Sequence, residues 1–347
     1  MAAAPARPDR WSERTVALQA NAKASPVLVA VWESGVDLAL FKTLPVAAQG
    51  LAYTADWQPS TDLRHLKQAV AALKPEQLKG FQEDLTLGLL YTHYSHVAGI
   101  ATAGNPFARV FAATVLFHGQ LEPLEPTEPT EDMSRRTAAA YQRTVDAMKA
   151  AGVRVVNMSW RYVPGSHEAA LTFHNVGKDA DERKQMAMRL FAIERDALRA
   201  AIVPAPAILF VAGSGNENDR ADFSEYIPTG LELANLITVG AVDRSGEETA
   251  FSTFGKTVKV HANGFAVDSL LPGADRARFS GTSMAAPQVS NLAAKLIAVE
   301  PQLTPVQVKQ LILANAEKRG RVNLIHPKAT LAALAALAKG SARAGGG

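Results

Sequence analysis

Ser283 lies in a segment of small residues, 279–287 (FSGTSMAAP), at the point where a helix is expected to begin. Apolar residues recur at helical spacing after it, and Pro287 is tolerated only close to a helix start. The serine hydroxyl should therefore lie near the positive end of a helix. A serine is a weak nucleophile until a base takes its proton, so catalysis also requires a histidine, an acid and an oxyanion donor elsewhere. Taken alone, the motif also fits an ordinary tight helix start.

Three further segments precede this motif in the chain. A strand-like apolar run leads into residues 33–37 (ESGVD), residues 93–99 read HYSHVAG, and a second apolar run leads into residues 212–218 (AGSGNEN). Together with residues 281–287 (GTSMAAP), and in this order, these segments resemble the subtilisin-like serine proteases, or subtilases. The resemblance extends from about residue 26 to residue 316.

The resemblance implies a catalytic triad. It makes Ser283 the nucleophile and His93 the general base, a role that suits an imidazole near neutral pH. Glu33 stands where the family has an aspartate, and a glutamate can orient the imidazole if its additional methylene is accommodated. Otherwise Glu33 points elsewhere and this contact is lost. Tyr94 and Ser95 replace the family's glycine and threonine, and the bulk of Tyr94 would narrow the cleft.

The resemblance also implies an oxyanion hole. Asn216 would donate its side-chain amide, and Ser283 its backbone N–H, to the charge that develops in the tetrahedral intermediate. A Gly-Asn pair after a strand also fits a simple turn.

The other histidines are expected to have structural roles. His96 should lie on a different face of the helix that carries His93. The same interpretation applies to His65, His118, His167, His174 and His261.

Residues around the nucleophile are expected to bind an extended substrate. In the family, a strand that ends in Asn-Met-Ser pairs with the substrate as an added strand, and residues 157–159 keep that sequence. Trp160 and Arg161 replace small residues, so they would narrow the cleft, and Arg161 would favour an acidic group on the substrate. In the alternative arrangement these side chains turn outward and cover residues 163–178. The expected substrate-binding residues are Ser159, Trp160, Arg161, Gly213, Ser214 and Gly215.

Residues 122–132 (EPLEPTEPTED) are acidic and rich in proline. Repeated prolines favour an extended loop, and the carboxylates keep it solvated, which indicates a surface segment. A sharper hypothesis makes this loop a lid that contacts Arg161 and admits only selected peptides.

The order of apolar segments predicts an α/β protein with three layers, in which a mostly parallel central sheet has helices on both faces. With 347 residues, of which 48% are hydrophobic, the chain can bury one large core. Strands are expected at 27–32, 109–115, 153–158, 207–211 and 236–242. Helices are expected at 134–151, with Gly152 as its stop, and at 181–201, 304–316 and 327–338.

A single peptidase domain is expected over residues 26–339. Residues 1–25 would form an N-terminal extension, and residues 340–347 a disordered tail. An extension that packed near the cleft would inhibit the enzyme until it was processed.

Composition argues against several classes of partner. The 36 lysines and arginines are dispersed among 33 acidic residues, so nucleic-acid binding is not expected. No run is long enough to span a membrane. The chain has no cysteine, hence no disulfide and no thiolate metal site.

The cellular location depends on whether the chain is full length. Since no signal peptide is recognisable, a cytoplasmic location is expected if it is, and a secreted or periplasmic one if a signal and propeptide were removed.

The expected activity is that of a serine endopeptidase, which cleaves peptides or proteins through an acyl-enzyme with a Ser-His-Glu triad in a restricted cleft. This chemistry needs no cofactor, and no metal ligands are predicted, although the resemblance allows structural calcium. The oligomeric state stays open. Two alternatives also remain. One is a catalytically impaired relative that binds peptides or proteins as a regulatory module, and the other is an esterase or amidase that acts on small molecules.

Overall fold

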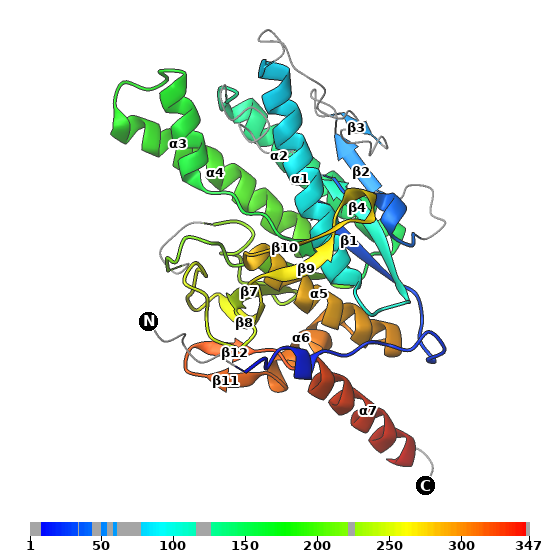
Figure 1. Cartoon of the computed structure of the whole chain (residues 1–347). Coiled ribbons are helices and arrows are strands. Elements are labelled where there is room, and N and C mark those ends of the chain that lie inside the picture. Colours follow the sequence, from blue (N-terminus) through cyan, green and yellow to red (C-terminus); the bar gives the residue numbers. More distant parts are fainter. Residues whose placement is uncertain are drawn as a thin grey trace.

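The computed structural model describes residues 8–33, 35–43, 50–53, 58–60, 78–115, 126–220 and 226–344. Its ten-stranded sheet has the order β11-β12-β8-β7-β6-β5-β1-β4-β2-β3, and β9 and β10 form a separate hairpin (Figure 1). The strands from β12 to β2 in this order run parallel, and β11 and β3 pair antiparallel at the two edges. The strands are β1 Val27–Glu33, β2 Gly50–Tyr53, β3 Pro59–Ser60, β4 Ala108–Thr114, β5 Val155–Met158, β6 Leu209–Gly213, β7 Leu236–Val242, β8 Val258–Asn263, β9 Val267–Leu270, β10 Arg276–Phe279, β11 Glu317–Arg319 and β12 Val322–Leu324.

Helices cover both faces of this sheet, as the three-layer prediction requires. Helices α1 and α5 pack on one face, and α2 and α4 contribute to the apolar cluster on the other. The α-helices are α1 Leu78–Thr102, α2 Glu131–Ala151, α3 Pro164–Phe173, α4 Ala180–Ile202, α5 Thr282–Val299, α6 Pro305–Ala314 and α7 Pro327–Ala344. The predicted fold class is therefore confirmed.

Strand β1 shows how the sheet separates the two cores. Successive side chains of a strand point to opposite faces. Val29 accordingly joins the cluster around α5, whereas Leu28 and Trp32 join the cluster beneath α2 and α4. By the same alternation, Glu33 points to the face that carries α1 and α5.

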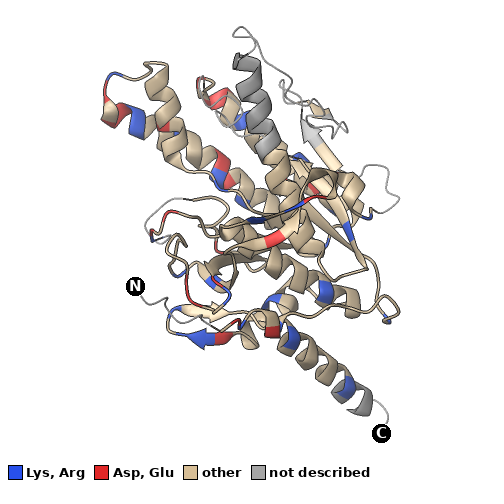
Figure 2. Ribbon diagram, viewed as in Figure 1, with Lys and Arg blue, Asp and Glu red and all other residues tan. Residues whose placement is uncertain are grey.

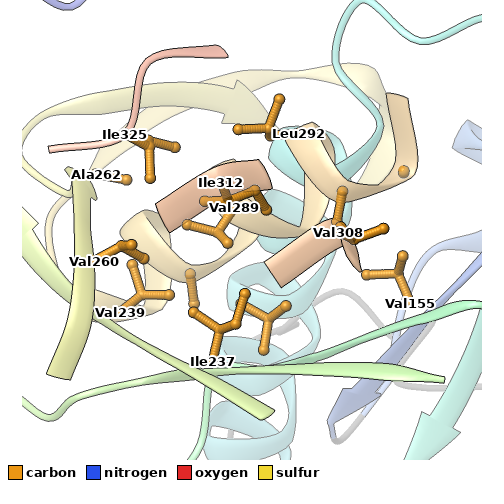
Figure 3. Close-up of a cluster of buried hydrophobic side chains, with 14 of the residues drawn as sticks. Val155, Ile237, Val239, Val260, Ala262, Val289, Leu292, Val308, Ile312 and Ile325 are labelled. Carbon is orange, nitrogen blue, oxygen red and sulfur yellow. The ribbon is translucent and has the colours of Figure 1, made fainter. Parts of the chain in front are cut away.

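Helix α5 is apolar around most of its circumference and is buried along most of its length. A helix of this kind is stable only inside a core. Figure 3 shows Val289 and Leu292 of α5 among side chains of β5, β7 and β8, with Val308 and Ile312 of α6 beside them. The first turn of α5 is therefore held firmly relative to the ends of the central strands.

Helix α2 begins earlier than the sequence predicted. The hydroxyl of Thr130 accepts a hydrogen bond from the N–H of Met133 (3.2 Å), so Thr130 caps the helix, and residues 131–132 of the acidic segment are helical. At the other end, Gly152 has a left-handed conformation (φ 77°) and ends the helix at the predicted position.

The N-terminal extension packs at the end of α5 that is far from Ser283. Ser25 N–H donates to Ala298 O (2.8 Å), and Lys295 Nζ donates to Val16 O (2.6 Å). Since α5 rises 1.5 Å per residue, Ala298 lies about 20 Å from Ser283 along the helix. The described part of the extension is therefore not near the cleft, contrary to the inhibitory arrangement considered from the sequence.

Two further segments differ in detail from expectation. Residues 163–178 contain α3, and α7 continues past Gly340, where the tail was expected to begin, to Ala344. Figure 2 shows lysines and arginines interspersed with acidic residues along the ribbon. Among the described residues, no helix combines the length and apolar character needed to cross a bilayer.

Candidate active site

The structure brings the four predicted catalytic residues to one edge of the sheet. Glu33 is the last residue of β1, Asn216 follows the end of β6, and Ser283 lies in the first turn of α5. Strands β6, β5 and β1 are parallel neighbours, so their carboxyl ends meet at this edge. Helix α1, which carries His93, packs against both β1 and α5.

The carboxylate of Glu33 is fully buried and is anchored on one side. Its Oε1 accepts hydrogen bonds from Ser159 N–H (3.0 Å) and Asn157 Nδ2 (3.2 Å). Its Oε2 lies 3.6 Å from His93 Nδ1, slightly beyond hydrogen-bond length, and within the described ranges neither of these two buried atoms has a hydrogen-bond partner. Burial raises the pKa of Glu33, while the nearby His93 and the bonds from Ser159 act in the opposite direction.

His93 and His96 occupy different environments, as the helical spacing predicted. The His93 side chain is 29% exposed and packs edge-on against Tyr94. His96 is fully buried, its ring stacks on Phe279, and its Nε2 donates to Ala277 O (3.0 Å). His96 thus connects α1 to β10, which leads into the Ser283 turn.

The hydroxyl of Ser283 donates to Ser159 O (3.2 Å). In the part of the chain that the structure describes, no hydrogen bond joins Ser283 Oγ to His93. Catalytic hydrogen bonds are often long or misaligned in a free enzyme and tighten when substrate binds. The hydroxyl of Ser283 is therefore bonded to the backbone of the segment after β5 and not to the imidazole.

The side chain of Asn216 is fixed by the start of α5. Its Oδ1 accepts hydrogen bonds from Thr282 N–H (2.9 Å) and from Thr282 Oγ1 (3.1 Å). With the carbonyl end occupied in this way, the NH₂ end of the amide remains to donate to another group. Gly213 lies close to this contact, because a Cβ at that position would be 3.1 Å from Thr282 Oγ1.

Two pockets flank the segment 159–161. The smaller has a volume of about 110 Å³, and the larger about 630 Å³. The smaller pocket is lined by Ser159, Trp160, Arg161, Gly213, Gly215, Asn216, Thr282 and Ser283. The larger is lined by Leu90, Thr92, His93, Tyr94, Ser159, Trp160, Arg161, Val163, Ser166 and Phe279.

Five of the six residues expected to bind substrate therefore line a pocket, and Ser214 does not. Its side chain is fully buried and donates to Thr253 O (2.8 Å). Ser214 is therefore turned toward Thr253 in the interior and not toward either of these two pockets.

Trp160 and Arg161 follow neither of the two simple arrangements considered from the sequence. The Trp160 ring is 7% exposed and packs against Trp32 and Tyr141, so most of it belongs to the core. Arg161 forms an ion pair with Glu217, and its guanidinium lies 5.2 Å from the centre of the Tyr226 ring. Its charge is therefore already paired within the protein.

The proposed lid falls partly outside the described residues, which exclude 116–125. In the part that is described, Pro126 O accepts a hydrogen bond from His174, and Thr130 caps α2. The ion pair of Arg161 is made with Glu217 rather than with this part of the acidic segment.

Sequence reasoning missed the residues that hold Glu33 and Arg161. Asn157 was noted only as part of an Asn-Met-Ser sequence, yet its amide bonds to Glu33, and its Oδ1 accepts from Ser290 of α5 (2.9 Å). Glu217 was not singled out, although it follows Asn216 directly. A polar residue inside an otherwise apolar strand needs a buried hydrogen-bond partner, and Asn157 could have been recognised on that ground. Among the described residues, no group of three or more His, Cys, Asp or Glu is arranged to hold a metal ion.

Comparison with known proteins identifies the family of the chain. The model of the subtilase family, Peptidase S8, matches residues 65–329. Subtilisin E of Bacillus subtilis (strain 168) is 33% identical over 113 residues, which make up 33% of this chain and 29% of that protein. Subtilisin-like protease 2 of Pseudogymnoascus destructans is 34% identical over 173 residues, or 46% of this chain and 42% of that protein. The match thus spans less than half the length of each relative.

Solved structures share the fold at lower identity. A cold adapted subtilisin-like serine proteinase has a TM-score of 0.57 and 19% identity, covering 90% of this chain and 92% of that chain. A lanthipeptide protease has a TM-score of 0.59 and 17% identity, covering 90% of each chain. This likeness shows the subtilisin-like fold.

Proposed function

Because this chain belongs to the subtilase family, we propose that it is a serine endopeptidase with a Ser-His-Glu triad. One observation carries the proposal: the fully buried Glu33 directs its Oε2 at Nδ1 of His93, 3.6 Å away, and in the part of the chain that the structure describes neither atom has a hydrogen-bond partner. An unpaired buried carboxylate oxygen is costly, so its placement opposite an imidazole favours a working contact over a chance one.

The extra methylene of glutamate is accommodated by its anchors. Asn157 and Ser159 bind Oε1 from the side of β5, so the carboxylate is held while Oε2 remains available to the imidazole. Once the 3.6 Å gap closes, Glu33 would accept from the Nδ1–H of His93 and leave Nε2 to act as the base. Glu33 thus takes the role that the family assigns to aspartate.

The reaction would proceed through an acyl-enzyme. As Ser283 Oγ attacks the substrate carbonyl, His93 accepts its proton and then delivers it to the departing amine. The amide of Asn216 and the backbone N–H of Ser283 stabilise the oxyanion, and water releases the acyl group. Because Thr282 holds the Asn216 carbonyl in advance, little reorganisation is needed when negative charge develops.

The two pockets favour a peptide over a small ester as substrate. The residue whose carbonyl is attacked must place its side chain beside Ser283 and Asn216, which both line the smaller pocket. Side chains alternate in an extended peptide, so the preceding residue would point to the other side, toward the larger pocket. The apolar walls of that pocket, such as Leu90 and Val163, suit an apolar side chain there.

The test is labelling of Ser283 with a fluorophosphonate probe, located by mass spectrometry, with Ser283→Ala and Glu33→Gln as controls. Rapid labelling of the wild type that is lost in Ser283→Ala and greatly slowed in Glu33→Gln would support the triad. Failure of folded wild-type protein to react would instead favour a catalytically impaired member of the family that binds peptides. Turnover of peptides but not of simple esters would separate a peptidase from an esterase.

A further inference from the structure

An ion pair lies beside the smaller pocket. Arg161 belongs to the wall that follows β5. Its partner Glu217 follows Asn216 of the opposite wall and is not itself one of the described residues that line the pocket. Strands β5 and β6 are adjacent, so the pair spans the gap between the segments that extend from their ends. Ser283 and Asn216 lie at the same pocket, on the side where the substrate carbonyl would be attacked.

Both partners of this pair are held by additional contacts. Glu217 Oε2 accepts the backbone N–H of Asn216 (2.9 Å), and the Arg161 guanidinium packs over the Tyr226 ring at 5.2 Å. The two side chains are only 31% and 34% exposed, which is low for a surface pair. These contacts fix the pair in place beside the pocket, and they connect it directly to the backbone of Asn216.

The size of the pocket limits which side chain can enter. Its volume is about 110 Å³. A cavity of about 150 Å³ holds one benzene ring, so this pocket is too small for an aromatic side chain. Because Arg161 and Glu217 neutralise one another, neither attracts a charged side chain while the pair is intact.

We propose that the Arg161–Glu217 ion pair acts as a selectivity gate, which restricts cleavage to bonds that follow a small uncharged residue such as alanine, serine or glycine. This inference rests on the proposed peptidase function. It replaces the expectation, drawn from the sequence, that Arg161 attracts an acidic group. The guanidinium would do so only after its partner was removed.

The test uses a set of fluorogenic peptides that differ only in the residue before the cleaved bond: Ala, Phe, Glu or Lys. The wild type is compared with Arg161→Gln, Glu217→Gln and the double variant. Glutamine is nearly isosteric with Glu217, and its carbonyl can still accept the Asn216 N–H. Arg135→Gln is the matched control, since Arg135 makes an exposed ion pair with Glu131 on α2.

The expected result is a reciprocal change in charge preference. The wild type and Arg135→Gln should cleave the Ala peptide at least about tenfold better than the other three peptides. The smaller pocket has too little room for the Phe side chain and no free charge to pair with Glu or Lys. Glu217→Gln should raise kcat/KM for the Glu peptide, and Arg161→Gln that for the Lys peptide, each by about tenfold relative to Ala. The double variant should favour neither charge and should accept Phe better than the wild type does.

Fluorophosphonate labelling of every variant separates this inference from the proposed function. Suppose that Ser283 is labelled but all variants keep the wild-type order of substrates, or that the wild type cleaves the Phe peptide as fast as the Ala peptide. Either result would contradict the role of the ion pair in selectivity, and the proposed peptidase function would remain supported. If wild-type Ser283 is not labelled, the peptidase function fails, and the gate fails with it.

Discussion

The two halves of the candidate active site differ in how completely they are assembled. Around Asn216, hydrogen bonds from Thr282 and the contact to Glu217 fix the side chain and the backbone before any substrate is present. Between Glu33 and His93, by contrast, two buried polar atoms face each other at 3.6 Å without closing a hydrogen bond. The groups that would stabilise charge are preformed, whereas the groups that would move a proton need a small adjustment.

This difference has a physical basis. The proposed oxyanion donors are a short side chain and a backbone group after the end of β6 and at the start of α5, which pack directly on one another. The proposed acid and base lie on β1 and α1, and their contact depends on a longer side chain with more rotatable bonds. Substrate binding is therefore expected to order the Glu33–His93 half more than the Asn216 half.

The largest effect should follow removal of the base. His93→Ala should lower kcat for peptide cleavage on the order of 10⁶-fold, as loss of the equivalent residue does in subtilisin. Single-turnover and steady-state rates on one peptide measure this directly. Residual activity within a hundredfold of the wild type would show that Ser283 is activated by another base. The proton-transfer half of the site would then not consist of Glu33 and His93.

The next largest effect should follow neutralisation of the acid. Glu33→Gln should lower kcat by about 10⁴-fold with little change in KM, because Glu33 orients the imidazole and lines neither pocket. Glu33→Asp sharpens the test, since the shorter side chain cannot reach both its anchors and His93. A loss of about 10²-fold is expected for this misplacement. Full activity of the aspartate variant would mean that the anchors at Asn157 and Ser159 do not set the carboxylate position.

A smaller effect is expected in the preformed half. Asn216→Ala should lower kcat by about 10²- to 10³-fold, through loss of one oxyanion donor. Thr282→Val keeps the backbone bond to Asn216 but removes the hydroxyl bond, so a loss of about tenfold is expected. Equal losses in the two variants would indicate that Asn216 acts by holding α5 rather than by binding the oxyanion.

The smallest effect concerns stability. Because burial raises the folded-state pKa of Glu33, the native protein loses stability as pH rises from the unfolded-state pKa of about 4.3 through the folded-state pKa. Glu33→Gln removes this buried charge, so it should raise Tm at pH 8 by about 2 °C, the shift that roughly 1 kcal/mol produces in a large domain. At pH 4, where most of the unfolded carboxyl is also protonated, the two proteins should melt closer together. A variant that is less stable than the wild type at pH 8 would show that the contacts of the ionised Glu33 outweigh its burial.

Much of the fold was predictable because continuous apolar runs and helix-ending glycines are local signals. The strand at 236–242 and the stop at Gly152 are examples. The candidate catalytic residues were found for a different reason, since each lies in a motif long enough to match a family. The structure brings these motifs together at one sheet edge.

The contacts that were missed depend on alignment between strands that are distant in the sequence. That Asn157 would reach Glu33, or that Arg161 would pair with Glu217, follows from the parallel register of β1, β5 and β6, which no local pattern specifies. The place where the N-terminal extension packs could not be predicted for the same reason. Its binding partners, such as Gly104, Arg244, Lys295 and Glu317, are scattered along the chain.

The position of that extension has a practical meaning. Residues 8–25 run along the side of the protein where α5 ends and α7 begins to extend from the body (Figure 1). A solid support or a fused protein attached through residues 8–25 would leave the cleft facing the solution. Protein immobilised in this way should therefore keep its cleft accessible to large substrates.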